Sequence, residues 1–331
     1  MATTGLKIGI IGRGPASAAH ADRLLAIEGV SLVGCADADP SAARALADRC
    51  SRPGRPVASF ADLGGLIRET SPDAVAIFTP HPSHYRPAMD ALQAGCHVFV
   101  EKPLTTNVQE AVDIAGVAKG RDRKVGVGHH FRLLPSLVRA REMLAEGAIG
   151  PVRLITATMA QPWLESHQTE ENAWRFDPRF AGGGILADSG IQLLDALLWS
   201  TGGSADLVAA IQAREPSGLD TVTAASIRLS DGTPATVAIS GVSPVPLFEL
   251  VYHGERGRLR ATDASLTEER GDGPPRPIPL PAPSGSVDAN FVEAILEGVP
   301  LCCPAEQAVP TIRLLEAIAR SATIGQFVGL A

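Results

Sequence analysis

The sequence predicts an α/β protein with two domains, the first of which is built on a doubly wound parallel sheet. One observation is length, because 331 residues exceed what a single domain usually contains. The other is a change of pattern near residue 129. Short apolar runs alternate with helical segments before this point, whereas several later runs alternate apolar and polar residues. We therefore expect domains at residues 1–128 and 129–331.

The first domain alternates β-rich apolar runs with helical segments rich in Ala and Leu. Continuous apolar strands separated by helices indicate a parallel sheet buried on both faces, and right-handed crossovers make such a sheet doubly wound. The expected strands are residues 7–12, 31–37, 74–79, 97–102 and 124–129. The expected helices lie near residues 15–28, 40–50, 83–95 and 106–119.

The second domain begins with a helix near 134–147 and continues with half-exposed strands. Antiparallel pairing is the simplest account of their alternating pattern, with turns at SDG and GERG. A proline-rich surface connection at 271–285 then leads into a helix. The expected strands are residues 152–160, 221–230, 233–241 and 248–263.

Composition narrows the class of protein. The chain is 45% hydrophobic and 20% charged, which is ordinary for a globular protein. Its formal net charge of −7 argues against a nucleic-acid or anionic-membrane partner. No signal peptide or apolar run of membrane-spanning length is recognisable, and the five cysteines form no metal-binding spacing. We expect no metal site, reduced thiols and a cytoplasmic location.

A glycine turn follows the first strand, where residues 12–17 read GRGPAS and run into a helix. Gly12 makes the turn, and Gly14 lets backbone amides approach a pyrophosphate at the helix N-terminus. The third position of the pattern needs only a small side chain, which Ser17 supplies. Gly12, Gly14, Pro15 and Ala16 are therefore expected to bind a dinucleotide.

Asp37 closes the second strand, 25 residues beyond Gly12. A carboxylate at this place suits a ribose diol and would repel a 2′-phosphate, so it favours NAD over NADP. Two further strand ends carry polar residues at the edge where open α/β sheets bind ligands. The expected cofactor-binding residues there are Thr79, Pro80, His84, Glu101 and Lys102, although His84 could instead cap the helix that follows.

The stretch GGGILADSGIQLLD at 182–195 runs from three glycines into a helix. The spacing of Asp188, Gln192 and Asp195 puts their side chains on neighbouring parts of one helix face. Such a layout suits proton transfer, but an amide does not titrate near neutral pH.

Together these residues resemble the glucose–fructose oxidoreductase / inositol dehydrogenase family, often called Gfo/Idh/MocA. The resemblance covers essentially the whole chain. It is carried by the glycine turn with His20 after it, Asp37, EKP at 101–103, HHFRLLP at 129–135, WRFDPRFAGGGILADSG at 174–190 and the closing helix at 311–325.

The resemblance implies a Rossmann domain followed by an α/β domain with a large, mostly antiparallel open sheet. It implies hydride transfer between NAD and a secondary hydroxyl or ketone of a sugar- or cyclitol-like substrate. Because the open sheet face often mediates assembly in this family, we expect a homodimer or homotetramer.

The resemblance also assigns roles to individual residues. Lys102 matches the lysine that holds and polarises the reacting oxygen, Asp188 matches the family's aspartate, and Asp195 matches the final carboxylate of the motif. The position of the usual proton-transferring histidine is Gln192 here. Catalytic roles are expected for Lys102, Asp188 and Gln192. The expected substrate-binding residues are His129, His130, Arg132, Trp163, Trp174 and Asp195. The two tryptophans would stack on a sugar-like ring or, as is commoner for this residue, pack in the core.

Gln192 leaves open which group takes the proton of the hydroxyl. Some group is expected to do so, because positioned acid–base catalysis typically contributes about a hundred- to ten-thousand-fold to the rate. Lys102, one of His129 and His130, or His167 could replace the usual histidine. Two other functions remain open at this point. One is a redox-neutral enzyme that keeps NAD bound and eliminates or hydrolyses a glycoside through transient oxidation. The other is a non-catalytic, nucleotide-binding regulatory protein.

Overall fold

The computed structural model describes residues 5–13 and 15–330, which form two compact units. The first unit contains the chain up to Gly128 together with Gly285–Ala308, and the second contains His129–Ser284 and the chain from Val309 onward. These units differ from the expected domains 1–128 and 129–331 in one segment. Residues 285–308 return to the first unit, because Phe291 packs on Phe99 with ring centroids 5.7 Å apart.

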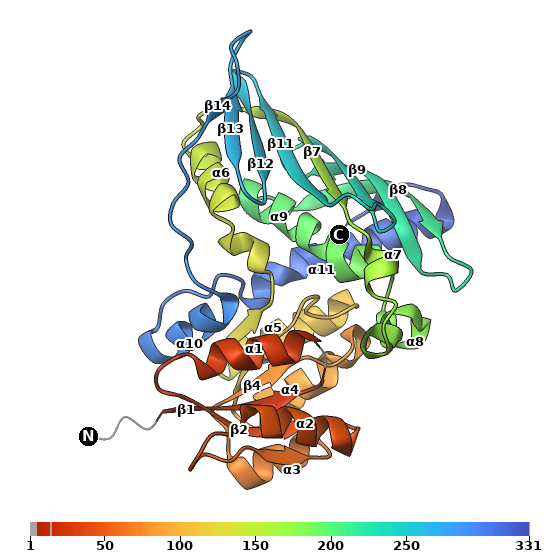
Figure 1. The fold of residues 1–331 in the computed structure, drawn as a ribbon. Coiled ribbons are helices and arrows are strands. Elements are labelled where there is room, and N and C mark those ends of the chain that lie inside the picture. The colour runs from red at the N-terminus through yellow and green to blue at the C-terminus, as the bar shows by residue number, and fades with distance from the viewer. Residues whose placement is uncertain (1–4, 14, 331) are drawn as a thin grey trace. The chain divides into compact units, whose positions relative to one another are not determined.

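The first unit is built on a six-stranded parallel sheet with strand order β3-β2-β1-β4-β5-β6 (Figure 1), as the doubly wound prediction requires. Its strands are β1 (Leu6–Ile11), β2 (Val30–Ala36), β3 (Ala58–Phe60), β4 (Ala74–Ile77), β5 (His97–Val100) and β6 (Val125–Val127). Its helices are α1 (Pro15–Leu25), α2 (Pro40–Cys50), α3 (Leu63–Thr70), α4 (Tyr85–Gln93), α5 (Val108–Gly120) and α10 (Val287–Glu297). Strand β3 and helix α3 were not expected from the sequence.

The strand order reverses beside β1, and this position is where the chain turns from β1 into α1. Gly12 has a φ of +94°, and a Cβ placed on it would lie 2.5 Å from backbone atoms of Phe78 and Thr79. Only glycine therefore fits here, and its backbone lies against the end of β4. Ligands of open α/β sheets bind at such reversals of strand order.

The second unit is built on a nine-stranded sheet with order β14-β13-β12-β11-β7-β10-β9-β8-β15. Its strands are β7 (Val152–Ala160), β8 (Ala205–Arg214), β9 (Asp220–Leu229), β10 (Pro234–Ser240), β11 (Leu247–Gly254), β12 (Gly257–Thr262), β13 (Leu266–Glu269), β14 (Arg276–Pro277) and β15 (Val328–Gly329). Most neighbours are antiparallel, as expected. The pairing of β7 with β10 is parallel, so fully antiparallel pairing was wrong at this place.

The helices of the second unit include α6 (Pro135–Ala145), α7 (Trp163–Ser166), α8 (Pro178–Ala181) and α9 (Ile191–Thr201), and α11 (Ala305–Ile324) runs through both units. Figure 1 shows α6 and α9 along one side of the large sheet. On β7, Ile155, Ala157 and Met159 are buried, whereas Thr156 and Thr158 between them are half-buried. One face of the sheet therefore carries the core.

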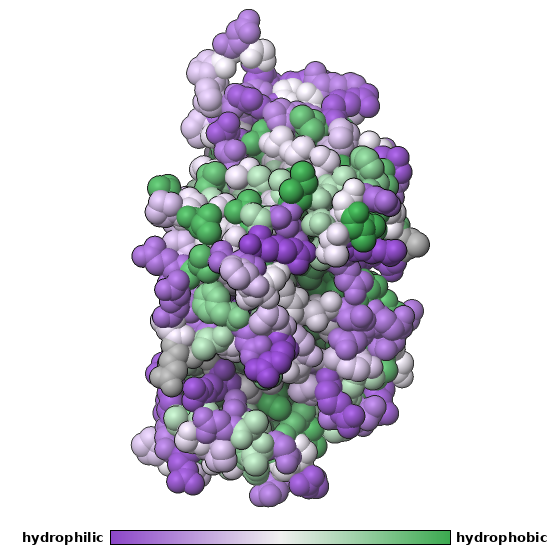
Figure 2. Space-filling model, turned by 90° about the vertical axis from the view of Figure 1, so that its right-hand side faces the viewer, coloured by the Kyte–Doolittle hydropathy of each residue, from purple (hydrophilic) through white to green (hydrophobic). Residues whose placement is uncertain are grey.

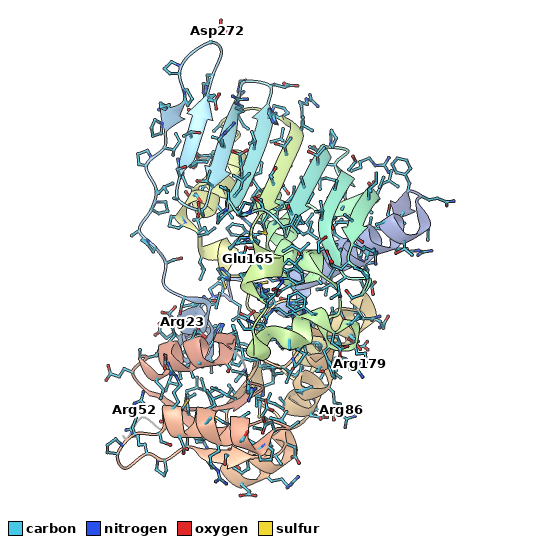
Figure 3. The ribbon with its side chains drawn as sticks, turned by 45° about the vertical axis from the view of Figure 1, so that its right-hand side comes forward. Arg23, Arg52, Arg86, Glu165, Arg179 and Asp272 are labelled. Carbon is cyan, nitrogen blue, oxygen red and sulfur yellow. The ribbon has the colours of Figure 1, made fainter. Side chains whose placement is uncertain are left out.

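The surface is mixed. Figure 2 shows one face on which hydrophobic residues lie in separate patches among hydrophilic ones. The proline-rich connection is exposed over most of its length, and Asp272 lies at its tip, between β13 and β14 (Figure 3). Within residues 5–13 and 15–330, no helix combines the length and the apolar character needed to cross a bilayer.

Candidate active site

The first unit presents a dinucleotide cradle at the end of β1. Gly12 lets the chain turn closely against the end of β4, where a Cβ would collide with backbone atoms, and Pro15 and Ala16 begin the helix that follows. Gly14 lies outside the described residues. The exposed amides at a helix N-terminus attract phosphate oxygens, so the turn fits a pyrophosphate.

Asp37 directly follows β2, as the sequence predicted. Its Oδ1 accepts a hydrogen bond from the backbone N–H of Asp39 at 2.9 Å, and this bond fixes the direction of the carboxylate. Nearby, Arg13 forms an exposed ion pair with Asp39 at 3.4 Å. The acidic end of β2 fits a ribose diol rather than a phosphate.

His84 belongs to the interior of the first unit. Its two ring nitrogens lie 2.7 Å from the carbonyl oxygen of Pro103 and 2.8 Å from that of Thr79. Burial lowers the pKa of this imidazole, and the side chain makes no capping hydrogen bond to α4. His84 therefore connects the turn after β4 to the turn after β5. Thr79 and Pro80 are half-buried and so lie nearer the surface than His84.

A buried charge cluster supports the turn after β5. Glu101 accepts a hydrogen bond from the backbone N–H of Lys102 at 3.0 Å, and its other oxygen lies 3.1 Å from Nε2 of His20. Nδ1 of His20 lies 2.5 Å from Asp288, which also pairs with Arg23. Burial lowers the pKa of His20, but its hydrogen bonds to Asp288 and Glu101 outweigh burial and raise it. The imidazole of His20 lies between two carboxylates and thus connects Asp288 to the EKP turn.

Asp288 was missed by sequence reasoning. It lies 187 residues beyond Glu101, on helix α10, and only the return of residues 285–308 to the first unit brings it to His20. No sequence motif marks Asp288. The available signal was an acidic residue in the first turn of a mostly apolar helix.

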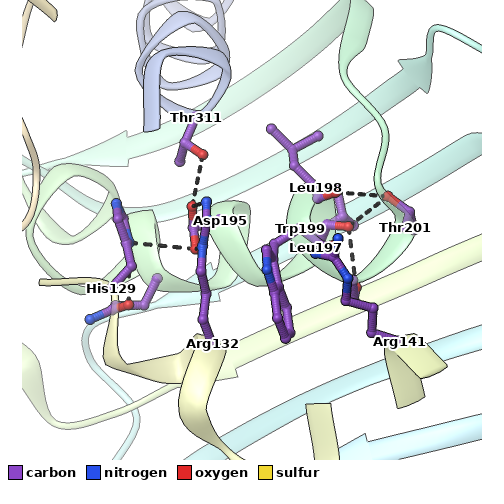
Figure 4. Close-up of polar contacts among 11 residues, drawn as sticks. His129, Arg132, Arg141, Asp195, Leu197, Leu198, Trp199, Thr201 and Thr311 are labelled. Atoms are coloured by element: carbon purple, nitrogen blue, oxygen red, sulfur yellow. Dashed lines mark hydrogen bonds and ion pairs between the residues drawn. The ribbon is translucent and has the colours of Figure 1, made fainter. Parts of the chain in front are cut away.

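In the second unit, a second buried network surrounds Asp195 on α9 (Figure 4). Arg132 donates two hydrogen bonds to its carboxylate, both at 2.8 Å, and Thr311 donates a third at 3.1 Å. Nδ1 of His129 lies 3.7 Å from Oδ2 of the same carboxylate. Burial raises the pKa of Asp195, but the charges of His129 and Arg132 and the hydrogen bonds outweigh burial, and the net shift is downward.

Gln192 lies one helical turn before Asp195 and is buried. Its Oε1 lies 3.4 Å from Nδ1 of His129, and its Nε2 lies 2.9 Å from Nδ1 of His130. The structure thus brings Gln192, His129 and His130 together, but in different environments. His129 is fully buried, whereas His130 is exposed.

Asp188 lies on a π-helical turn, η4 (Leu186–Gly190), that precedes α9. Two hydrogen bonds reach its Oδ2, from the indole N–H of Trp163 at 2.6 Å and from Nε of Arg175 at 3.1 Å. Such π-turns re-aim side chains and are frequent at functional sites. The carboxylate of Asp188 is therefore oriented within the second unit by its own neighbours.

The glycine run before Asp188 is anchored by Asp220 of β9. This carboxylate accepts hydrogen bonds from the backbone N–H of Gly184 at 2.8 Å and of Leu186 at 2.9 Å. A Cβ on Gly184 would lie 1.9 Å from the carbonyl oxygen of Asp220. This position therefore requires glycine, and Asp220 sets where the turn carrying Asp188 begins.

The two tryptophans differ from the expected sugar-stacking pair. Trp163 is 1% exposed and packs against Phe176 with ring centroids 5.5 Å apart, so its ring presents no face for stacking. The half-buried ring of Trp174 is covered by the guanidinium of Arg175 at 4.3 Å. His167 follows the last residue of α7, and its Nδ1 lies 2.9 Å from the carbonyl oxygen of Trp163.

Two models of known protein families match segments of this chain. Residues 6–129 match the model of an oxidoreductase family with an NAD-binding Rossmann fold. Residues 137–260 match the model of the GFO/IDH/MocA C-terminal domain.

Two curated relatives illustrate the range of similarity. The chain is 27% identical to D-glucoside 3-dehydrogenase of Escherichia coli strain K12 over 61% of its own length and 56% of that protein. It is 29% identical to inositol 2-dehydrogenase of Acidothermus cellulolyticus over 80% of its length and 83% of that protein. For the relatives matched first, the chain spans little more than half of their length.

The fold is also that of a solved levoglucosan dehydrogenase in complex with NADH. The TM-score is 0.86 at 22% identity, and the superposition covers 99% of both chains. With both halves matched by the family's two domain models, the chain belongs to the Gfo/Idh/MocA oxidoreductase family, and its first unit is an NAD-binding Rossmann domain.

Proposed function

We propose that the protein is an NAD-dependent oxidoreductase that transfers a hydride between nicotinamide and a secondary hydroxyl or ketone of a sugar- or cyclitol-like substrate. The observation that carries the proposal is the fixed EKP turn, in which Glu101 holds the backbone of Lys102 and is itself held by His20. The sugar and inositol dehydrogenases among the relatives support the substrate class.

The proposed roles follow from the chemistry of each side chain. Lys102 holds the reacting oxygen by a hydrogen bond. As the neutral amine it takes the hydroxyl proton in oxidation, and as the ammonium it returns a proton in reduction. Asp188, held by Trp163 and Arg175, orients the substrate. The turn at Gly12 and the carboxylate of Asp37 hold NAD, which supplies the hydride acceptor when bound.

The experiment is a test for cofactor binding followed by a search for turnover. The purified protein is analysed for copurifying NAD, and absorbance at 340 nm is then followed with a panel of sugars and cyclitols. NADH formed in proportion to product supports the proposal. Product without NADH indicates the redox-neutral alternative, and absence of nucleotide binding contradicts both.

A matched pair of variants tests the role of Lys102. Lys102→Met is expected to abolish turnover, because methionine keeps the length of the side chain and removes the ammonium. Lys119→Met changes an exposed lysine on α5 of the same unit and is expected to leave turnover unchanged. Equal rates in the two variants would contradict the assignment.

The proposed assembly is a homodimer or homotetramer joined through the open face of the large sheet. That face carries small side chains on β8, β9 and β10, and it borders Ile211 and Phe327, which are 79% and 70% exposed. Ile211→Asp is expected to lower the mass measured by light scattering, whereas Val112→Asp on α5 is the control. An unchanged mass for Ile211→Asp would contradict the proposed interface.

The proposed location is a reducing compartment such as the cytoplasm. Support comes from Cys35, Cys50 and Cys96, whose buried thiols are free. Thiol titration of the protein isolated without reductant is expected to find five per chain.

A further inference from the structure

Gln192 joins two consecutive histidines that have opposite environments. Its amide spans from Nδ1 of His129, 3.4 Å from Oε1, to Nδ1 of His130, 2.9 Å from Nε2. His129 is fully buried, and His130 is exposed. An amide has an acceptor oxygen at one end and a donor NH₂ group at the other. One of its two partners must therefore donate a hydrogen bond and the other must accept one.

The buried carboxylate of Asp195 decides which end of the amide faces which histidine. An ionised carboxylate only accepts hydrogen bonds, and Oδ2 of Asp195 lies 3.7 Å from Nδ1 of His129. A lone pair on that nitrogen would face the carboxylate and be repelled. The hydrogen of His129 therefore lies on Nδ1, and the amide of Gln192 must turn its carbonyl oxygen towards it.

The other end of the amide then fixes the hydrogen of His130. With Oε1 directed at His129, the NH₂ group of Gln192 donates to Nδ1 of His130. That nitrogen uses its lone pair to accept, so the ring hydrogen of neutral His130 lies on Nε2. The charged groups around this chain of contacts are Arg132 and Asp195, which form a bidentate pair, and His129 when its ring is protonated. The hydrogen on Nδ1 of His129 is present in both charge states of that ring.

We propose that Gln192 makes His130 a hydrogen-bond donor to an oxygen of the substrate, through Nε2–H, and prevents it from acting as the catalytic base. Gln192 is then a positioning residue rather than a weakened proton acceptor. The substrate part of this inference rests on the function proposed above, in which Lys102 takes the hydroxyl proton. The tautomer part rests on the second unit alone.

The first test measures the tautomers directly in the full-length protein without substrate. Histidines labelled with ¹⁵N give long-range ¹H–¹⁵N correlations that distinguish Nδ1–H from Nε2–H, and His130→Gln assigns the signals of His130 by their loss. At neutral pH we expect Nε2–H for His130 and Nδ1–H for His129. A His130 that carries Nδ1–H, or that averages between both tautomers, would overturn the proposal.

Gln192→Glu tests whether the amide sets the tautomer. A carboxylate only accepts, so His130 is expected to change to Nδ1–H or to the doubly protonated form. Gln326→Glu alters an exposed glutamine of the same unit and is expected to leave the His130 signals unchanged. A His130 spectrum that is the same in Gln192→Glu and in the native protein would show that Gln192 does not position it.

The second test asks what His130 does in turnover, with the best substrate of the panel. His130→Ala is expected to lower kcat/KM about ten-fold, as for the loss of one neutral hydrogen bond, without removing an ionisation from its pH profile. His130→Gln keeps an N–H near the same place and is expected to recover most of the loss. Disappearance of an ionisation in His130→Ala would identify His130 as the base and overturn the proposal. If no turnover is found at all, the proposed function and the substrate part of this inference fail together, while the tautomer measurement still decides the tautomer part.

Discussion

Trp163 donates its indole N–H to Asp188, with 2.6 Å between Nε1 and Oδ2, and is itself almost completely buried. Helix α7, which begins at Trp163, thus contacts the π-helical turn and holds the carboxylate in one direction. An indole N–H is a donor without acceptor capacity, so this contact persists only while Asp188 presents an oxygen.

Trp163→Phe is predicted to lower kcat/KM by about ten-fold, because the ring volume largely remains while the hydrogen bond to Asp188 is lost. The measurement is steady-state kinetics with circular dichroism as a check on folding. Trp199→Phe provides the control, since the ring of Trp199 on α9 packs against the guanidinium of Arg141 on α6, 4.6 Å from the ring centroid. Equal effects of the two changes would contradict a specific role for the indole.

Asp195→Asn is predicted to destabilise the fold by about 3–5 kcal/mol. The change removes one partner of a buried pair and leaves the guanidinium of Arg132 without its counter-charge. Urea unfolding measures the loss, and Asp206→Asn, at an exposed pair with Arg228, is predicted to cost less than about 1 kcal/mol. A similar loss in both variants would mean that the buried pair contributes no more than the exposed one.

Protonation of His20 links the stability of the first unit to pH. Because the pKa of His20 is raised in the fold, its contribution is fully present below the unfolded value of about 6.5 and is lost as pH rises through the folded value. The difference in unfolding free energy between the native protein and His20→Gln is therefore predicted to be largest at pH 5.5–6.5 and to shrink towards alkaline pH. A difference that grows with pH would show the opposite sign and contradict a protonated cluster.

Asp37→Ser is predicted to shift cofactor preference towards NADP, because it removes a carboxylate that would repel a 2′-phosphate. Dissociation constants of NAD and NADP measured by fluorescence titration give the ratio. Asp48→Ser, on the exposed side of α2, is predicted to leave the ratio unchanged. An unchanged ratio in Asp37→Ser would remove this residue from cofactor choice.

The sequence predicts the layout of the fold well where chemistry and pattern are local. The parallel strands around Gly12 are mostly apolar, and β7 occupies the expected residues 152–160. Strand β3 was not predicted because Ala58–Phe60 is too short to show a periodic pattern of apolar residues. The parallel pairing of β7 with β10 was not predicted because it joins residues about 80 positions apart.

The candidate site shows the same limit. Lys102, Asp188, Gln192 and Asp195 are visible as motif residues, but what surrounds them is not. Asp288 reaches His20 only because the chain returns to the first unit, and the burial of Trp163 reverses the ring-stacking role expected for it. The spacing of Gln192 gives no sign that its amide contacts both His129 and His130, because those contacts join segments 62 or more residues apart.

Hydride transfer is the central claim, and it is tested most directly by following the hydrogen itself. The best substrate of the panel is prepared with deuterium on the carbon that bears the reacting hydroxyl, and the nicotinamide is analysed by mass spectrometry after turnover. The account predicts NADH carrying one deuterium in the native protein and in Lys119→Met, and none formed in Lys102→Met. Product released without any deuterated NADH would contradict it.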